Sequence, residues 1–360
     1  MYLNSGHSVT LKDVATRAGV SHQTVARVVN NAGKVAAETR VKVEKAIAEL
    51  NYVPNRLAQQ LAGKKILSIG FASIDISLHT ISAIMAGIKD QAQQHGYSLA
   101  VSVMDGTDHQ SCVRAVNELV EQRVDGIIIN SLATHMSTEE FKQLNLSIPC
   151  VFLDADPNLN ASQINHDQSQ GAYLAAKHLL DLGHRDIAII NGPDQIRVCE
   201  LRLHGWRQAL TEANIEPTMV LNGAWDAQSG YDCASRLLSQ GNSLSAILVG
   251  NDQMSLGVLR AISDRGLQVP HDISVVGFDN QDDCAFYHPP LTTITQDSGE
   301  LGRQSVRLLL NQISEPSLDQ HQKLANSIVV RGSTKALGEE NGNKQLIESL
   351  MRQLNLALQR

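Results

Sequence analysis

Hydrophobic residues between positions 11 and 30 recur at the spacing of two short helices, each with one apolar face. Gly19 is predicted to end the first helix, because glycine readily adopts the left-handed backbone that follows a helix. Ser21 is predicted to cap the second helix, because its hydroxyl can accept a hydrogen bond from an unpaired backbone N–H. The apolar positions of the two faces are Val14, Ala15, Ala18, Val25, Val28 and Val29.

The second of these helices has polar residues where a DNA-binding helix would need them. In a helix-turn-helix unit the second helix enters the major groove, and its N-terminal residues contact base edges. His22, Gln23 and Arg27 supply hydrogen-bonding groups suited to bases or phosphates. The spacing also fits an ordinary helical hairpin with solvated side chains, so both interpretations remain open at this point.

A third amphipathic helix is expected over 39–51, with Val43, Ile47 and Leu50 facing inward and a Tyr-Val-Pro sequence stopping it. Residues 55–63 include good helix formers but are too few to form a stable helix alone in water. They are interpreted as a linker that becomes helical only when something holds it.

From position 66 the pattern changes to apolar, strand-like runs that alternate with amphipathic segments of helix length. Such repeated βα units are typical of doubly wound parallel sheets with helices on both faces. The units are more than one sheet usually holds, so two similar lobes with a ligand-binding cleft between them are expected. The expected strands are 66–73, 98–104, 126–131, 149–154, 187–191, 219–223, 246–249 and 273–278, with crossovers or edge strands at 291–296 and 327–330. The expected helices include 82–94, 110–121, 168–182 and 198–212.

The end of the chain is another amphipathic segment, which follows a stretch of linker composition. Ile347, Leu350, Leu354 and Ala357 are spaced as one apolar face of a helix. Because an isolated helix with such a face needs a partner, a small bundle of several helices is expected. Packing of this helix against its own lobe is the alternative.

The charge of the chain is unevenly distributed. The formal net charge is −7, from 30 Lys and Arg and 37 Asp and Glu. Ten of the basic and four of the acidic residues fall within 1–65, which gives that part +6 and leaves −13 for the remainder. A small basic module on a large acidic body is typical of a DNA-binding head with a separate regulatory domain.

Other function classes lack their usual signatures. The five cysteines and thirteen histidines are dispersed without metal-ligand spacing, so no metal or cofactor is expected and the thiols are predicted to be reduced. A P-loop, a G-x-S-x-G elbow and a G-x-G-x-x-G after the first strand are all missing, which argues against an enzyme. With neither a leader-like N-terminus nor a long apolar run, a cytoplasmic, nucleoid-associated bacterial protein is expected.

The order of these parts resembles the lactose/galactose repressor family from about Val9 to the end of the chain. The segments most specific to the resemblance are 19–30, 49–63, 250–257 and 272–279, with further agreement at 201–206 and 289–294. The resemblance implies a three-helix head and two lobes of the periplasmic-binding-protein type, an α/β fold with doubly wound sheets, and a C-terminal amphipathic helix. The expected division is a head at 1–54, a hinge at 55–64, a two-lobed core at 65–334, a linker at 335–343 and an oligomerisation helix at 344–360. Within the core we expect an N-lobe of about 65–166 and 296–326, and a C-lobe of about 167–295 and 327–334.

The resemblance also implies which residues contact DNA. His22 and Gln23 match the base-reading pair of the recognition helix, although the member of the family that the chain most resembles has tyrosine in place of His22. Residues 55–61 match a hinge helix, whose Leu61 would wedge into the minor groove, and interdomain packing is the alternative role for this leucine. The implied DNA-binding residues are Thr10, Ser21, His22, Gln23, Thr24, Arg27, Asn30, Asn55 and Leu61.

Residues of the cleft match ligand-contacting positions of the family. Carboxylates and a forked guanidinium suit the neighbouring hydroxyls of a sugar. A structural ion pair between Asp154 and Arg202, and a core role for Trp225, are the alternatives. The implied ligand-binding residues are Leu78, Ile84, Asp154, Arg202, Trp225, Asn251, Asp279 and Gln296. Residue types that depart from the pattern stand at Ile81, His166, Val198 and Ser298, which leaves the specific sugar open.

Together these observations predict a repressor of a sugar-utilisation operon that a small sugar, such as a galactoside, releases from a near-palindromic operator. The resemblance implies a homodimer that assembles to a homotetramer, without a membrane partner. The alternative is a cytosolic or transport-type sugar-binding protein without a role in gene regulation, which would share the two-lobed fold.

Overall fold

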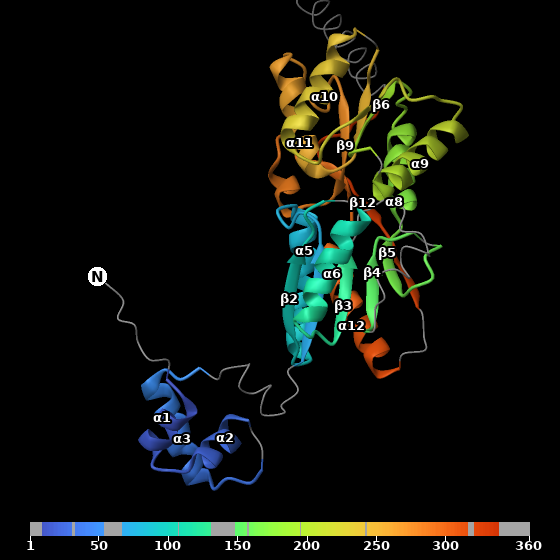
Figure 1. The fold of residues 1–360 in the computed structure, drawn as a ribbon. Helices are drawn as coiled ribbons and strands as arrows, with labels where there is room; N and C mark the ends of the chain where they lie inside the picture. The colour runs from blue at the N-terminus through green and yellow to red at the C-terminus, as the bar shows by residue number, and fades with distance from the viewer. Residues whose placement is uncertain are drawn as a thin grey trace, which may run out of the picture. The chain divides into compact units, whose positions relative to one another are not determined.

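In the computed structural model the chain forms two compact units, residues 1–67 and 68–360. Figure 1 shows the elements of both. The structure describes residues 9–30, 33–53, 67–106, 108–130, 148–156, 158–194, 196–241, 243–315 and 320–337. The expected hinge and the C-terminal helix therefore lie outside the described residues.

Among the described residues of the first unit are the helices α1 (Leu11–Ala18), α2 (His22–Val29) and α3 (Ala37–Leu50). Gly19 ends α1 in the left-handed region at φ 67°, and the Ser21 hydroxyl accepts the Thr24 N–H at 3.2 Å to cap α2. Both predictions are confirmed.

The apolar faces of these helices meet in one small core. Its buried members are Val14, Ala15, Val25, Val28, Val43, Ala46 and Tyr52. The predicted inward face of α3 is confirmed: Val43 is buried, and Ile47 and Leu50 are half-buried and pack against the core, where Ala46 is a further buried member.

The second unit consists of an N-lobe and a C-lobe, each built on a six-stranded sheet. The N-lobe sheet is wholly parallel, in the order β11-β5-β4-β3-β1-β2. Its strands are β1 (Ser68–Ser73), β2 (Ser98–Val103), β3 (Gly126–Asn130), β4 (Cys150–Leu153), β5 (Gln163–His166) and β11 (His321–Leu324), and its helices are α5 (His79–Gln94), α6 (His109–Glu121) and α12 (Ser298–Ser314).

The C-lobe sheet has the order β12-β10-β9-β8-β6-β7, and only β12 is antiparallel to its neighbour. Its strands are β6 (Ile187–Asn191), β7 (Val220–Asn222), β8 (Ala246–Val249), β9 (Ser274–Asp279), β10 (Thr292–Thr295) and β12 (Ser327–Val329). Its helices are α8 (Gln168–Asp181), α9 (Arg197–Glu212), α10 (Ala227–Ser239), α11 (Asp252–Asp264) and the 3-10 helix η1 (Asp282–Phe286).

Helices cover both faces of each sheet, as the alternating pattern predicted. In the C-lobe, α8 and α9 bury one face and α10 and α11 bury the other, as Figure 1 shows. In the N-lobe, α5 and α12 pack on one face and α6 on the other. Among the described residues no helix is long and apolar enough to cross a membrane.

The sequence pattern did not predict two of the strands, and it assigned a third strand to the wrong position in its sheet. β5 and β11 read Gln-Ile-Asn-His and His-Gln-Lys-Leu, so neither has the apolar run that signals a buried strand. β10 was expected to be a crossover or an edge strand, but it lies inside its sheet between β9 and β12. β12 is an edge strand as expected.

The chain passes between the lobes three times, after β5, after β10 and after β11. A cleft is therefore formed by the carboxyl ends of strands from both sheets. The position of α5 at this cleft depends on its contact with α12, where glycines let the two backbones approach closely. A Cβ on Gly302 would lie 2.2 Å from the Ile84 carbonyl oxygen.

Gly302→Ala is expected to destabilise the chain by at least about 2 kcal/mol, because backbone rather than a movable side chain opposes the added methyl group. The midpoint of chemical unfolding measures this effect. Gly299→Ala on the same helix is the matched control, since its Cβ would first meet the Arg303 side chain at 3.4 Å. Equal effects of the two substitutions would contradict the proposed close contact.

Candidate functional site

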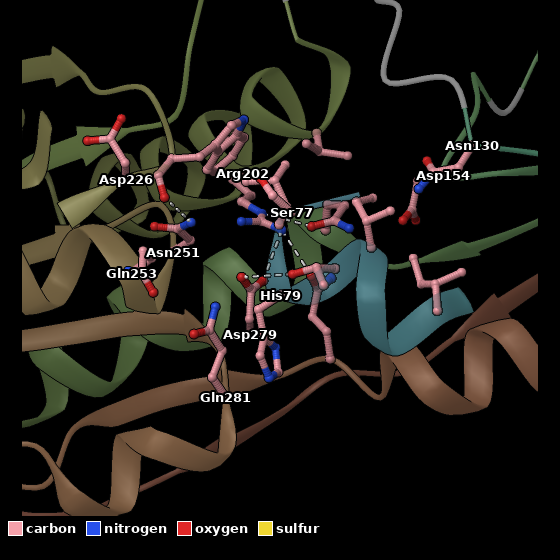
Figure 2. A pocket seen from close by; sticks show the side chains of 18 residues that line it. Ser77, His79, Asn130, Asp154, Arg202, Asp226, Asn251, Gln253, Asp279 and Gln281 are labelled. Carbon is pink, nitrogen blue, oxygen red and sulfur yellow. Dashed lines mark hydrogen bonds and ion pairs between the residues drawn. The ribbon is translucent and has the colours of Figure 1, made fainter. Parts of the chain in front are cut away.

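A cavity of about 320 Å³ lies between the lobes, and Figure 2 shows the side chains that line it. All eight predicted ligand-binding residues are among these side chains. They come from the ends of β4 and β9, from α5 and its N-cap, from the N-cap of α11, from α9, and from loops: Leu78, Ile84, Asp154, Arg202, Trp225, Asn251, Asp279 and Gln296. One cavity thus gathers residues that span more than 200 positions of the sequence.

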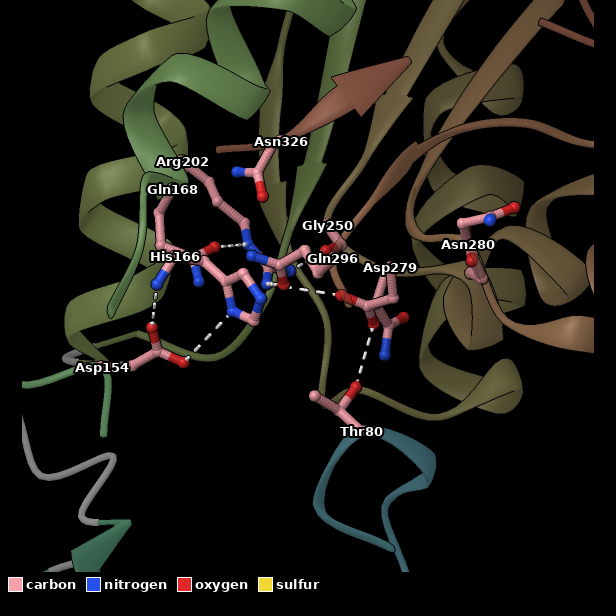
Figure 3. A network of polar contacts seen from close by, with 12 residues as sticks. Thr80, Asp154, His166, Gln168, Arg202, Gly250, Asp279, Asn280, Gln296 and Asn326 are labelled. Atoms are coloured by element: carbon pink, nitrogen blue, oxygen red, sulfur yellow. Dashed lines mark hydrogen bonds and ion pairs between the residues drawn. The ribbon is translucent and has the colours of Figure 1, made fainter. Parts of the chain in front are cut away.

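Arg202 is the centre of the polar network in this cavity, which Figure 3 shows. Its Nε donates to Gln168 Oε1 at 2.9 Å, and its Nη2 donates to Gln296 Oε1 at 2.9 Å. Nη1 donates to the Gly250 carbonyl, and Nη2 lies 3.5 Å from Asp279 Oδ1. The guanidinium also stacks 4.0 Å from the centre of the Phe278 ring. Since so many groups surround it, Arg202 fixes the positions of the side chains around the ligand space.

Asp154 does not pair with Arg202, so the expected alternative of a structural ion pair between them is wrong. Its Oδ1 instead accepts the His166 N–H at 2.9 Å, and its Oδ2 lies 3.9 Å from His166 Nδ1. Asp154 follows β4 with φ 48°, a strained conformation for a residue other than glycine. The carboxylate keeps lone pairs that face the cavity as hydrogen-bond acceptors.

Asp279 ends β9 with a side chain that is 8% exposed. Burial raises its pKa to about 7, although Arg202 and a hydrogen bond from Thr80 oppose the shift. Asp252, whose charge interacts with that of Asp279, is fully buried, and desolvation raises the pKa of Asp252 to about 6. Thr293 Oγ1 donates to Asp252 at 2.6 Å, which holds this second carboxyl in place.

Asn251 and Trp225 form the C-lobe wall of the cavity. Asn251 caps α11 through a hydrogen bond from the Met254 N–H at 2.8 Å, and its Nδ2 donates to the Trp225 carbonyl at 3.0 Å. Trp225 has φ 71° and is half-buried. Trp225 packs against two apolar clusters of the C-lobe and also lines the cavity, so a ligand contact and a packing role both remain predictions for it. Trp206, which is 1% exposed, is a fully buried core tryptophan.

The sequence pattern did not predict several of the residues that line the cavity. Asn130 ends β3, so the rule that ligands bind at the carboxyl ends of parallel strands could have found it. Asn130 Oδ1 and Gln296 Nε2 are buried and have no hydrogen-bond partner among the described residues. The missed lining residues are Ser77, His79, Thr80, Asn130, Gln168, Asp226, Gln253 and Gln281. Of the four positions that depart from the family pattern, Ile81 and Val198 line the cavity, whereas His166 and Ser298 do not.

The predicted DNA-binding residues of the head differ in how far they are exposed to solvent. His22, Gln23 and Arg27 are exposed on α2, and Thr24 and Asn30 are half-buried. Thr10 and Ser21 are exposed, and each hydroxyl caps a helix. Asn55 and Leu61 lie outside the described residues.

All five cysteines are free thiols. Burial raises the pKa of the Cys112 and Cys199 thiols to about 12, so these two are not nucleophiles at neutral pH. Across the described residues, no group of His, Cys, Asp and Glu could hold a metal ion.

Comparison with known proteins agrees with both parts of this architecture. A model of bacterial regulatory proteins of the lacI family matches residues 10–55, and a model of a periplasmic binding protein-like domain matches residues 176–334. The lactose operon repressor of Escherichia coli (strain K12) is 44% identical over 95% of this chain and 96% of its own length. The transcriptional repressor PurR of Haemophilus influenzae (strain ATCC 51907 / DSM 11121 / KW20 / Rd) is 34% identical over 91% of this chain and 99% of its own length.

Solved structures give the same result. The lac repressor dimer bound to operator and the anti-inducer ONPF superposes with a TM-score of 0.82 at 44% identity, covering 92% of this chain and all of that one. A complex of the transcriptional regulator CelR with cellobiose has a TM-score of 0.68 at 28% identity, covering 90% of this chain and 99% of that one. These relatives are regulators rather than enzymes. The chain belongs to the lacI family of bacterial regulatory proteins.

Proposed function

We propose that this protein is a transcriptional repressor whose head binds an operator and whose cleft binds a small sugar that causes release. The observation that carries this proposal is the convergence of eight predicted ligand residues on one cavity. A cytosolic or transport-type sugar-binding protein is less well supported, because such a protein would not need a basic helix-turn-helix head with exposed polar residues on α2.

The cavity suits a sugar because it combines polar groups with apolar surface. Asp154 offers acceptors, Gln296 Nε2 is an unpaired donor and Asn130 Oδ1 is an unpaired acceptor, so alternating hydroxyls could bond to all three. The indole of Trp225 and the side chain of Val198 offer apolar surface to the C–H face of a ring. A galactoside is the favoured ligand, since the relative at 44% identity is a lactose operon repressor.

In the head, Gln23 can bond adenine bidentately, and Arg27 can bond guanine or a phosphate. We propose that Thr10, Ser21, Thr24, Asn30 and Asn55 support this contact, and that Leu61 wedges into the minor groove. Two heads would then occupy successive major grooves of a near-palindromic site. Assembly of dimers to a tetramer through the residues after 344, and a cytoplasmic location, belong to the same proposal.

The test measures operator binding with and without sugars. The full-length protein first selects its sequence from a random DNA library, and fluorescence anisotropy then follows binding in lactose, methyl β-galactoside, cellobiose or ribose. We expect at least one galactoside to weaken operator binding by roughly 5- to 150-fold, the usual range of allosteric coupling. Arg202→Lys should retain operator binding but respond less, because lysine cannot hold four partners at once. Binding that no sugar alters would refute the switch.

His22 is expected to determine part of the operator sequence. His22→Ala should weaken binding to the selected operator by about 1–3 kcal/mol and relax the preference at one base pair in each half-site. Sugar affinity, measured by calorimetry, should not change, because the head contributes no residue to the cavity. Glu44→Ala, which alters an exposed residue of α3, is the control. An unaltered base preference in the variant would remove His22 from the recognition surface.

Sugar affinity is expected to fall as the pH is lowered from 8 to 6. The pKa of Asp279 is raised to about 7 by burial, so Asp279 is ionised at pH 8 and largely protonated at pH 6. Protonation removes acceptor capacity from the cavity, and the loss in affinity could reach about tenfold over this range. Calorimetric titrations at several pH values measure it. The affinity of Asp279→Asn should depend less on pH, and a wild-type affinity that is constant from pH 6 to pH 8 would contradict this role.

A further inference from the structure

Thr80 forms a hydrogen bond across the cleft that neither the family pattern nor the ligand proposal uses. It lies in the first turn of α5 in the N-lobe, and its Oγ1 donates to Oδ2 of Asp279 at 3.3 Å, at the end of β9 in the C-lobe. Figure 3 shows this contact beside the Arg202 network. Because Arg202 lies at Oδ1, the two carboxylate oxygens of Asp279 are held from opposite lobes.

The start of α5 is suited to hold a carboxylate. Leu78 is its N-cap and makes no side-chain hydrogen bond, and the first turn contains no acidic residue. The unpaired N–H groups and dipole of a helix N-terminus favour a nearby negative charge. Asp279 supplies that charge from the other lobe, and its pKa is lowered by the Thr80 hydrogen bond against the larger effect of burial.

We infer that the Thr80 hydroxyl is an interlobe clasp, that is, a hydrogen-bond donor that joins the two lobes and competes with the ligand for Asp279. Both residues line the cavity, so a sugar hydroxyl that donates to Oδ2 of Asp279 must displace the Thr80 hydroxyl or share this oxygen with it. The hydrogen bond joins the two lobes, so part of the binding free energy of such a ligand is used to replace it. The inference rests on the proposed function, because it assigns a regulatory role to a residue of the same cavity.

A direct ligand contact by Thr80 is the competing explanation, and the two predict opposite effects. If Thr80 donates to the bound sugar, removal of its hydroxyl weakens binding. If Thr80 is a clasp, the same change strengthens binding, because Asp279 becomes available without a competing donor. The substitution Thr80→Val distinguishes the two explanations, because valine keeps the branched shape of threonine but lacks its hydroxyl.

The first experiment measures affinity for methyl β-galactoside and for cellobiose by calorimetry on the full-length protein. Thr80→Val should bind about 3- to 10-fold more tightly than wild type, the range for one moderate hydrogen bond to a charged group. Thr80→Ser retains the hydroxyl and should bind within about twofold of wild type. Thr211→Val, an exposed threonine at the end of α9, controls for the substitution itself and should not alter affinity. Unchanged or weaker binding by Thr80→Val would overturn the clasp.

A second experiment does not depend on the identity of the sugar. Hydrogen–deuterium exchange on the ligand-free protein follows the peptide that covers residues 78–85. Loss of the clasp in Thr80→Val should speed exchange there several-fold, while Thr80→Ser and Thr211→Val should match wild type. If the wild-type protein binds neither sugar, the proposed ligand class is wrong. The exchange rates still test whether Thr80 forms the clasp. Equal rates in Thr80→Val and wild type would reject it.

Discussion

The buried guanidinium of Arg202 is the interaction on which the cleft depends. A charge in this position is costly to desolvate and is tolerated only when several groups bond to it. Gln168, Gln296, Asp279 and the Gly250 carbonyl provide these bonds, and the ring of Phe278 covers the plane. Because each partner follows a different strand or crossover, this one side chain fixes how the strand ends converge. Ligand recognition then relies on the atoms that Arg202 leaves unpaired.

At the cleft, Thr80 and Asp279 join the lobes through a polar hydrogen bond, whereas each lobe has its own apolar cores. A polar contact such as that of Thr80 with Asp279 can exchange with a ligand hydroxyl at little net cost, but a packed core cannot. Strained backbone gathers at the same place, with positive φ at Asp154, Trp225 and Asp279. The surrounding structure must hold these residues in place, which pre-organises their side chains for a ligand.

Much of the fold could be predicted from the sequence because its signals are local. Strands such as β3 and β6 are continuous apolar runs, and Gly19 and Ser21 mark helix ends through their own backbone and side-chain chemistry. β5 could not be found, since its polar side chains are buried through hydrogen bonds that a pattern of apolar positions does not reveal, as when Gln163 donates to the Leu159 and Asp156 carbonyls. The eight cleft residues were predicted through a family pattern rather than through periodicity, which says nothing about which strand ends meet.

The sequence alone determined the helix-turn-helix head, the alternating α/β body and the basic and acidic division of the chain, because propensity, periodicity and charge are properties of short segments. Only the tertiary structure decided which side chains are partners. In the structure Arg202 pairs with Asp279 rather than with Asp154. Asp154 bonds to His166, and Thr80 of the N-lobe bonds to a carboxylate of the C-lobe. The first two pairings join elements within one lobe and the third joins the two lobes, and no local sequence pattern contains that geometry.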